Sequence, residues 1–564
     1  MTCNYNPFLQ LKTYIIVPIL FLAFCTQLKA QSSLPLSFDA INEYHRRNQL
    51  LGQFDSTVSF LKLPLYSESF SKPLFGLNEE TRPTGFQKNK WMDVQLLPVL
   101  SKSVYNQKQP YGWNNGSILP ASGYQQMISA GFSAKVGPLK IQLYPEYLYA
   151  QNKEYDGFPL EAYDLIWYNY YRSQLNYIDT PERFGEKSIN EVLWGQSSIK
   201  LEFGPVAFGL SNENIQWGPG KRNSLVMSNN ARGFKHLTFN SSRPVKTPIG
   251  SFEWQLIGAK LENSGYTPPR PFFTYNGRFI RNPKNPDWRY MSGLMLGYQP
   301  KWIPGLSLGL TRVVQQYSET AKQNNDYLAA LGSVFRKNDK IDDIVRDQLA
   351  SIFLRYFWTS TKSEFYFEFA RNDASWNFRD FFLEPGHAAG FMFGFNKLFP
   401  YKRKSDEFIE ANLEWTILQQ SANRIIRNAS TFYIHSRVRQ GYTNYGEVMG
   451  AGIGPSGNSQ TFNVNWVQGI NKIGLQLERY VHNNDLYIDL FTITQDPRRH
   501  WIDISAFAKA TWQFDDLIID GKLGVIKSLN YQYQILDQLR TPQFFIPGKD
   551  VINVSAGLDL IYIF

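Results

Sequence analysis

From about residue 90 to the C-terminus, apolar and polar residues alternate with a period of two. In VINVSAGLDLIYIF, at the C-terminus, one face carries Ile552, Leu558 and Phe564, and the other carries Asn553 and Asp559. A period of two is the spacing at which side chains share one face of a β-strand. The pattern therefore predicts that most of the chain is β-structure.

The same alternation recurs between short turns that contain glycine or proline. SEFYFEFAR places three phenylalanines on one face and Glu364, Tyr366 and Glu368 on the other. Further strands are predicted at Leu139–Tyr149, Ile199–Leu210, Phe252–Leu261, Leu306–Val314, Ile409–Leu418, Phe462–Val467, Ile473–Tyr480, Trp501–Phe514 and Leu523–Leu536.

The apolar faces of these strands are rich in aromatic residues, and charged residues stand on the opposite faces. Aromatic residues make up 16% of the chain, with 42 Phe, 33 Tyr and 14 Trp. A soluble β-sandwich also alternates, but its buried face usually holds medium-sized aliphatic side chains. Aromatic side chains outward to lipid and polar ones inward to a lumen explain both faces. Because backbone groups in hydrocarbon must all be paired, such a sheet closes on itself. The sequence predicts an all-β transmembrane β-barrel.

Chain length limits the number of strands. With roughly 9–11 residues per spanning strand plus turns and loops, residues 86–564 predict an antiparallel barrel of about 16–20 strands. Two long inserts, near 163–194 and 326–349, have partly helical spacing and are predicted to be loops or lids rather than hairpin turns.

The N-terminal residues have the features of a secretory signal. An apolar run, Tyr14–Phe24, is too short to span a bilayer, which predicts a signal peptide at 1–30 with cleavage after Ala30. Both cysteines, Cys3 and Cys25, lie within this leader, so disulfides do not stabilise the mature chain. Residues 31–85 are predicted to form a small N-terminal periplasmic helical region, because SFDAINEYHRRNQLLG has the caps and apolar stripe of a helix.

The charge balance favours an anionic partner. The full chain carries a formal charge of +10, and removal of the two leader lysines leaves +8 (56 basic less 48 acidic residues). Nucleic acid is not predicted as a partner, because the chain is predicted to be exported and its sequence contains no nucleic-acid-binding motif.

A stretch without acidic residues, 214–252, concentrates part of this charge. It contains WGPGKRNSLVMSNNAR, in which a tryptophan and a Gly-Pro-Gly turn precede cations and amides. The turn has a structural explanation, because glycine and proline fold a loop back sharply. Alternatively, the indole face packs on a sugar while Asn and Arg donate to its hydroxyls. The candidate polysaccharide-binding residues here are Trp217, Lys221, Arg222, Asn229, Asn230 and Arg232.

A second candidate cluster is the row Tyr433, His435, Arg437 and Arg439. If FYIHSRVR is a strand, its period of two places all four side chains on one face, towards the lumen. We expect this row and the cations of 214–252 to form one surface that engages an acidic polysaccharide. The alternative is a ladder of ion pairs with inward acids of the barrel wall such as Glu364, Glu368 or Asp559.

No catalytic or cofactor chemistry is predicted. The sequence has no G-x-S-x-G elbow and no phosphate-binding loop, and its six histidines lack the paired spacing of a metal site. Acid pairs for glycoside hydrolysis are defined by spatial separation, so sequence leaves them open.

The segment WGPGKRNSLVMSNNA, the helical N-terminus, the barrel-like strands and the aromatic C-terminus together resemble the capsule assembly protein Wzi family. RPVKTPIGSFEWQLIGAKLE (243–262) and FYIHSRVRQGYTNYGEVMGAGIGP (432–455) are similar to the branch found in Bacteroidetes-type bacteria. The resemblance implies an outer-membrane barrel of eighteen strands with a small periplasmic helical bundle. It also implies a lectin that binds capsular polysaccharide and assembles it at the cell surface, rather than an enzyme.

Three other functions remain open from sequence: a diffusion porin, a barrel enzyme acting on envelope lipid or glycan, and a scaffold for another envelope machine. The expected partners are a capsular or other surface polysaccharide, acidic by the charge argument, and outer-membrane lipid. The barrel assembly machinery is a further expected partner, through the C-terminal strand that ends at Phe564.

Overall fold

The structure is a computed structural model that describes residues 33–66, 92–335, 345–372, 378–401, 406–421, 429–491, 499–534 and 550–564. The predicted signal peptide, its cleavage after Ala30, residues 67–85 of the predicted N-terminal region and the middle of the second predicted insert lie outside the described residues.

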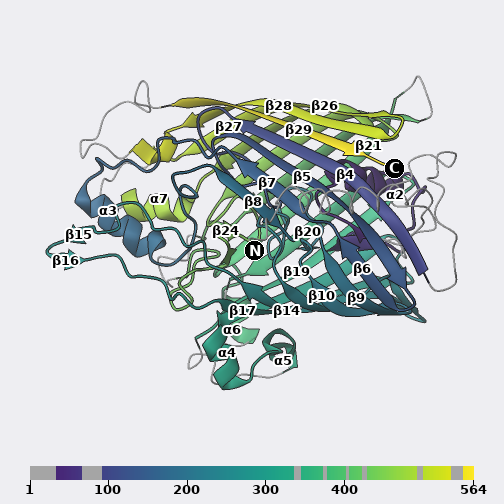
Figure 1. The fold of residues 1–564 in the computed structure, drawn as a ribbon, viewed down its shortest axis with the longest axis horizontal. Helices are drawn as coiled ribbons and strands as arrows, with labels where there is room; N and C mark the ends of the chain where they lie inside the picture. The colour runs from purple at the N-terminus through teal and green to yellow at the C-terminus, as the bar shows by residue number, and fades with distance from the viewer. Residues whose placement is uncertain are drawn as a thin grey trace, which may run out of the picture.

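A single closed antiparallel barrel accounts for most of the chain (Figure 1). Its strands are β4 (Met92–Asn106), β5 (Gly123–Val136), β6 (Leu139–Leu143), β7 (Glu146–Ala150), β8 (Ile189–Leu193), β9 (Ser198–Phe203), β10 (Val206–Ser211), β12 (His236–Ser241), β13 (Val245–Thr247), β14 (Gly250–Leu261), β17 (Arg289–Pro300), β18 (Leu306–Tyr317), β19 (Asp347–Trp358), β20 (Ser363–Arg371), β21 (Ala389–Pro400), β22 (Glu407–Ile417), β25 (Asn458–Gln468), β26 (Asn471–Val481), β27 (Ile502–Phe514), β28 (Leu517–Leu529) and β29 (Val551–Tyr562). Three neighbouring pairs, β6–β7, β8–β9 and β12–β13, are interrupted single strands, so the barrel has 18 strands. The predicted fold class is confirmed.

Prolines and glycines explain where the predicted strands are longer than the observed ones. The expected strand Leu139–Tyr149 breaks into β6 and β7 at Pro145, which has no N–H to give to the ladder. The expected strand Ile199–Leu210 is a hairpin, because Gly204 takes a φ of +60° and Pro205 follows it. Alternation cannot distinguish a tight turn that keeps the period from a continuous strand.

The barrel is inverted relative to a soluble protein. In β26 the outward side chains of Ile473 and Leu475 are 53% and 48% exposed, whereas the inward Gln476 and Glu478 are each 3% exposed. In β20 the inward Glu364, Tyr366 and Glu368 are fully buried, while the phenylalanines between them face outward, as the alternation predicts. The polar side chains therefore face the lumen and the apolar ones face lipid.

The barrel closes between its first and last strands. Strand β29 pairs with β4 from Ser555↔Asn106 to Tyr562↔Val99, and Asp559 stands opposite Lys102. The ammonium of Lys102 lies 3.0 Å from the Asp559 carboxylate, inside the lumen. A buried pair of opposite charges disfavours a shifted register, since a slip would separate Asp559 from Lys102 and leave its carboxylate buried without this partner.

The two ends of the barrel differ in the length of their connections. At the end near the C-terminus the turns are short, such as 137–138, 204–205 and 515–516, and α2 lies there (Figure 1). At the opposite end, all connections are longer, and they carry most of the remaining helices and hairpins. These are α3 (Asp164–Tyr170), the π-helical turn η2 (Tyr171–Leu175), β15 (Thr274–Tyr275), β16 (Arg278–Phe279), α4 (Ser318–Asn324), α5 (Ala329–Phe335), α6 (Phe378–Leu383), α7 (Asn484–Phe491) and the 3-10 turn η5 (Tyr531–Gln534). Among the described residues, no helix is both long enough and apolar enough to cross a bilayer.

The N-terminal residues 33–66 enter the short-turn end of the barrel. They comprise β1 (Ser33–Leu34), α2 (Asp39–Leu50), β2 (Lys62–Leu63) and β3 (Leu65–Tyr66), with β1 paired to β3. The last turns of α2 carry Arg46 and Arg47, which reach Glu364 and Glu410 on the inner wall. The helix is therefore anchored to the inner wall, and we call residues 33–66 the N-terminal plug.

Candidate functional site

The loop 212–235, which holds the WGPG turn, runs from the long-loop end deep into the lumen. Its strand β11 (Gln216–Trp217) pairs with β2, with Trp217 opposite Lys62. The amide of Gly218 donates to the carbonyl of Leu61 at 2.8 Å. A loop from one end of the barrel thus meets the N-terminal segment from the other end.

Trp217 anchors this meeting point. Its side chain is fully buried, and its indole Nε1 donates to Gln255 Oε1 on β14 at 2.9 Å. Gly218 has a φ of +107°, and a Cβ on it would lie 2.8 Å from a carboxylate oxygen of Glu368, so a side chain is excluded. A buried indole offers no face to a sugar at the surface, and the structure therefore favours the structural explanation of the turn.

Acidic residues of the inner wall hold the backbone of the loop. Glu414 on β22 accepts the amides of Lys221, Arg222 and Asn223 at 2.9, 3.0 and 2.7 Å. Glu368 on β20 accepts the amide of Leu225 at 3.0 Å. Three backbone N–H groups thus converge on Glu414 and one on Glu368, and these bonds fix the path of the loop through the lumen.

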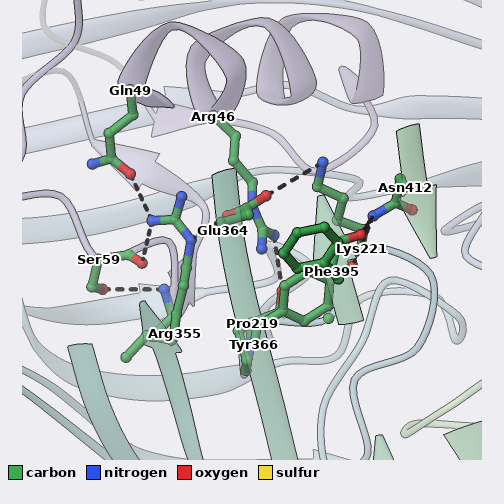
Figure 2. Close-up of polar contacts among 12 residues, drawn as sticks. Arg46, Gln49, Ser59, Pro219, Lys221, Arg355, Glu364, Tyr366, Phe395 and Asn412 are labelled. Carbon is green, nitrogen blue, oxygen red and sulfur yellow. Dashed lines mark hydrogen bonds and ion pairs between the residues drawn. The ribbon is translucent and has the colours of Figure 1, made fainter. Parts of the chain in front are cut away.

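The cations that follow the turn are also paired. Figure 2 shows Arg46, Lys221 and Arg355 around Glu364, at 3.0, 3.4 and 2.7 Å from its carboxylate. Lys221 lies 3.4 Å from Glu410 as well. The guanidinium of Arg222 lies 3.0 Å from Glu478 and 4.0 Å from the ring centroid of Trp113. Although burial opposes its charge, Glu478 raises the pKa of Arg222 above its ordinary value.

The stretch 214–252 contains no acidic residue, but acidic side chains from other parts of the chain lie beside several of its cations. Its cations separate into three places: Lys221 and Arg222 lie in the lumen, Arg232 and Lys235 line a cleft at the long-loop end, and Arg243 and Lys246 are exposed at the short-turn end. The prediction of one continuous cationic surface is wrong, because the loop enters the lumen and then returns to the wall at β12. The acidic partners of Lys221 and Arg222 come from strands more than 100 residues away in sequence.

The two candidate asparagines brace neighbouring loops. Asn229 accepts from Asn214 Nδ2 at 2.8 Å, and its own amide donates to Asn114. Asn230 donates to the carbonyl of Val448 at 2.8 Å. The candidate Arg232 forms a 2.8 Å ion pair with Glu191.

The second candidate cluster does not form a strand. Residues 429–442 are a series of turns within the connection between β22 and β25. Alternate residues of this segment therefore do not share one face. Phe432, Tyr433 and Ile434 are all buried in succession. The expected row facing the lumen and the expected ladder with inward acids are both wrong, because the segment is not a strand. The three acids have other partners: Glu364 pairs with Arg46, Lys221 and Arg355, Glu368 accepts the amide of Leu225, and Asp559 pairs with Lys102.

The four residues of this cluster have different environments. Tyr433, with a φ of +69°, donates to the carbonyl of Leu225 at 2.6 Å and accepts the amide of Ala451. His435 Nδ1 accepts the amides of Arg437 and Val438 at 3.2 and 2.9 Å. The side chain of Arg437 is exposed at the long-loop end, and the guanidinium of Arg439 donates to the carbonyls of Asn282 and Pro283.

Arg439 belongs to a group of cations on the loops at this end. The pKa of Lys284 is lowered to about 8, first by burial and also by the neighbouring charges of Arg281 and Arg439, against the opposite influence of Asp179. Asp179 is itself engaged, since its carboxylate accepts the amide and the hydroxyl of Ser264, each at 2.7 Å. We define Arg281, Lys284 and Arg439, together with the exposed Arg437 two positions before Arg439 in sequence, as the outer basic cluster.

Sequence reasoning missed the acids and cations that organise the lumen. Arg46, Arg355, Glu410 and Glu414 carry no local signal, because their partners are set by the closure of the barrel. Within the described ranges, no group of three or more His, Cys, Asp or Glu side chains is arranged to hold a metal ion.

Comparison with known proteins identifies the family. Residues 100–515 match the capsule assembly protein Wzi family. The chain belongs to the Wzi family. A solved Wzi from Escherichia coli, described as a carbohydrate-binding β-barrel of the outer membrane involved in group 1 capsule assembly, superposes with a TM-score of 0.57 at 12% identity, covering 94% of this chain and 100% of that one.

More distant barrels are also similar. The OccK8 (OprE) structure from Pseudomonas aeruginosa covers 84% of this chain and 97% of its own, with a TM-score of 0.38 and 10% identity. No protein of curated function matches the chain in sequence. This member of the Wzi family is thus an outer-membrane β-barrel whose lumen is occupied by its own N-terminal segment and loops.

Proposed function

We propose that this Wzi-family barrel binds an acidic capsular polysaccharide and helps to retain it at the cell surface. The observation that carries the proposal is the outer basic cluster: the guanidinium of Arg439 donates to the carbonyls of Asn282 and Pro283, and the pKa of Lys284 is lowered first by burial and further by the nearby charges of Arg281 and Arg439. A group of like charges at the mouth of the barrel is stabilised by a polyanion that neutralises it. Carbohydrate binding by the E. coli Wzi supports the same role.

The orientation of the barrel is part of this proposal. Outer-membrane barrels have short periplasmic turns and longer extracellular loops. By that rule the long-loop end faces the outside, and the N-terminal region that holds α2 lies on the periplasmic side. The segments 243–262 and 432–455 support a place in the Bacteroidetes-type branch of the family. We also infer that the strand ending at Phe564, 43% exposed, is the one that the barrel assembly machinery recognises.

The candidate residues contribute in two ways under this proposal. Trp217, Lys221, Arg222, Asn229, Asn230 and Tyr433 shape the loops from within the lumen. Arg437 and Arg439 contact the polymer directly, with Arg281 and Lys284. No catalytic residue is proposed, because the role requires only binding.

The test compares two sets of charge removals in capsulated cells. The variant Arg281→Gln/Arg437→Gln/Arg439→Gln removes three charges from the outer basic cluster. The matched control, Arg243→Gln/Lys246→Gln/Lys301→Gln, removes three exposed charges from the short-turn end. Each exposed contact is worth only about 0–1 kcal/mol and is screened by salt, so several must be removed together.

We expect the first variant to shed more polysaccharide into the medium than the parent does at equal barrel abundance. Its shedding should be greater at high salt than at low salt, because salt screens the charges that remain. The control should retain as much cell-bound polysaccharide as the parent. Equal retention by both variants would show that the outer basic cluster does not hold the polymer.

A further inference from the structure

The barrel wall has an interruption beside β8. Among the described strands, β8 pairs only with β7. The strand that would cover its other edge, β10, ends at Ser211, where the chain turns into the lumen, and β12 begins only at His236. A cavity of about 420 Å³ lies at this interruption, between β8 and the end of β14. That volume is within the range of small-molecule and cofactor sites.

Charged and amide groups line this side cleft. Arg232 and Glu191 form a 2.8 Å pair, and Lys260 and Glu262 form a 2.6 Å pair. Lys235 also lines the cleft; it is exposed and forms no ion pair with any residue that the structure describes.

Two polar atoms of the lining are buried without a partner. Arg232 is 9% exposed, and its Nε has no hydrogen bond within the described structure. The Oδ1 atom of Asn263 is likewise buried and accepts no hydrogen bond from any described residue. A buried donor or acceptor left unpaired destabilises the folded protein, because it has lost its bonds to water. A ligand that accepts from Arg232 and donates to Asn263 would remove that destabilisation.

Aromatic side chains form the rim of the cleft. Trp194 is 62% exposed and Tyr266 is 41% exposed. Tyr445 also lines the cleft, and the guanidinium of Arg232 lies 5.0 Å from its ring centroid. Exposed aromatic faces beside fixed donors and acceptors suit a ligand with both C–H faces and hydroxyls, which describes a sugar ring.

We propose that the side cleft is a second glycan site, which takes a short segment of an acidic sugar chain. The sugar face would lie on Trp194 or Tyr445, Arg232 Nε and the Lys235 ammonium would contact its carboxylate or phosphate, and Glu191, Glu262 and Asn263 would accept from its hydroxyls. The two ion pairs and the amides disfavour an acyl chain. The inference rests on the proposed polysaccharide binding, and it adds a site in the wall of the barrel, apart from the outer basic cluster.

The first experiment measures binding to the purified barrel in detergent. The probe is capsular polysaccharide from the same cells, cut by mild acid to short oligosaccharides. Trp194→Ala and Lys235→Ala should each weaken binding, by about five-fold or more for loss of the aromatic contact. Phe272→Ala is the matched control, since Phe272 is an 84% exposed aromatic residue of the long-loop end that does not line the cleft.

A second measurement keeps the test valid if a variant folds poorly. Both natural cysteines lie in the predicted leader, so Trp194→Cys introduces a single thiol for labelling with a polar maleimide. The oligosaccharide should slow labelling of this thiol but not that of Phe272→Cys. Vesicles of lipopolysaccharide and inorganic phosphate are run in parallel to identify the source of the acidic group.

The outcomes separate the two proposals. If the parent protein binds the oligosaccharide while Trp194→Ala and Lys235→Ala bind as well as Phe272→Ala, and the thiol is not protected, the side cleft is not a glycan site and surface binding stands. If the parent binds no oligosaccharide and no lipopolysaccharide, both proposals fail. Protection by phosphate alone would indicate an adventitious ion only and would overturn the inference.

Discussion

At the scale of single residues, the lumen is built from buried ion pairs that link segments distant in sequence. Glu364 is fully buried and is held by Arg46 of α2, Arg355 of β19 and Lys221 of the loop 212–235. Removing one partner of a buried charge network is costly, because the remaining charges have neither water nor a counter-ion. Glu364 therefore ties the N-terminal plug, the wall and the loop together.

The substitution Glu364→Gln tests this role. It would leave three cations around a neutral amide, and we expect a loss of roughly 3–5 kcal/mol in the local stability of the plug. The temperature at which the folded barrel loses its fast migration in gels should fall clearly. Glu319→Gln, at an exposed position on α4, is the control and should not shift this temperature. Equal transition temperatures for both variants would show that Glu364 is dispensable.

Sequence could predict which way these side chains point but not what they contact. The alternation places Tyr366 inward, and it is inward. Alternation alone would suggest that a polar or charged replacement there is tolerated. In the structure the Tyr366 hydroxyl donates to Glu414 at 3.0 Å, its ring fills the space over Gly394, and Arg46 lies 4.9 Å from its centroid. An arginine at 366 would meet another cation.

At the scale of strands and loops, strands were predictable because their pattern is local. Each strand alternates its two faces over about ten residues. Apolar side chains on one face contact lipid, and polar side chains on the other face line the lumen. The loop 212–235 was not predictable in the same way. Its route depends on Glu368 and Glu414, which no local pattern connects to Leu225 or Lys221. The segment 432–439 shows the opposite error, because a chance alternation there predicts a strand that does not form.

The depth of a residue in the lipid-facing wall gives a prediction for strands. Phe367 stands midway along β20, opposite Phe393, whereas Phe399 is near the short-turn end of β21. Arginine costs about 2–4 kcal/mol at the midplane and about 0–1 near the interface. Phe367→Arg should therefore reduce the amount and heat stability of assembled barrel much more than Phe399→Arg. Similar losses for both would mean that the outward register of β20 is misassigned.

A buried carboxyl gives the long loops a dependence on pH. Burial raises the pKa of Glu182 from 4.5 to about 7, although the amide of Phe158 donates to it. Between these pH values the folded loop holds a proton that the unfolded loop has released. The stabilisation is therefore complete below pH 4.5 and is lost as the pH rises through about 7.

Limited proteolysis of the loop 151–188 measures this effect. Cleavage should be slower at pH 5 than at pH 8 after correction for the protease's own pH profile. Glu182→Gln cannot ionise, so its cleavage rate should change little with pH, while Glu186→Gln, at an exposed position, should behave as the parent does. A pH dependence that survives in Glu182→Gln would assign the effect to another group.

At the scale of the whole molecule, the barrel is wide enough for a channel but its lumen is occupied. Residues from the loops 107–122, 212–235 and 429–457 form one buried apolar cluster with the inner wall, and it includes Trp113, Trp217 and Tyr433. The N-terminal segment packs in a second cluster with β4, β5 and β7. A diffusion porin needs a continuous aqueous path, and this arrangement opposes one.

Conductance across a planar bilayer tests whether the lumen is closed. We expect the purified protein to show no sustained open level, because two plugs from opposite ends meet at β2 and β11. Deleting residues 33–66 removes one plug, its charges at Arg46 and Arg47, and the partner of β11, so conductance should appear. Deleting the outer hairpin 272–280, which lies outside the luminal clusters, should leave the protein closed. A stable ohmic current in the intact protein would restore the porin alternative and would require the loops to leave the lumen in the membrane.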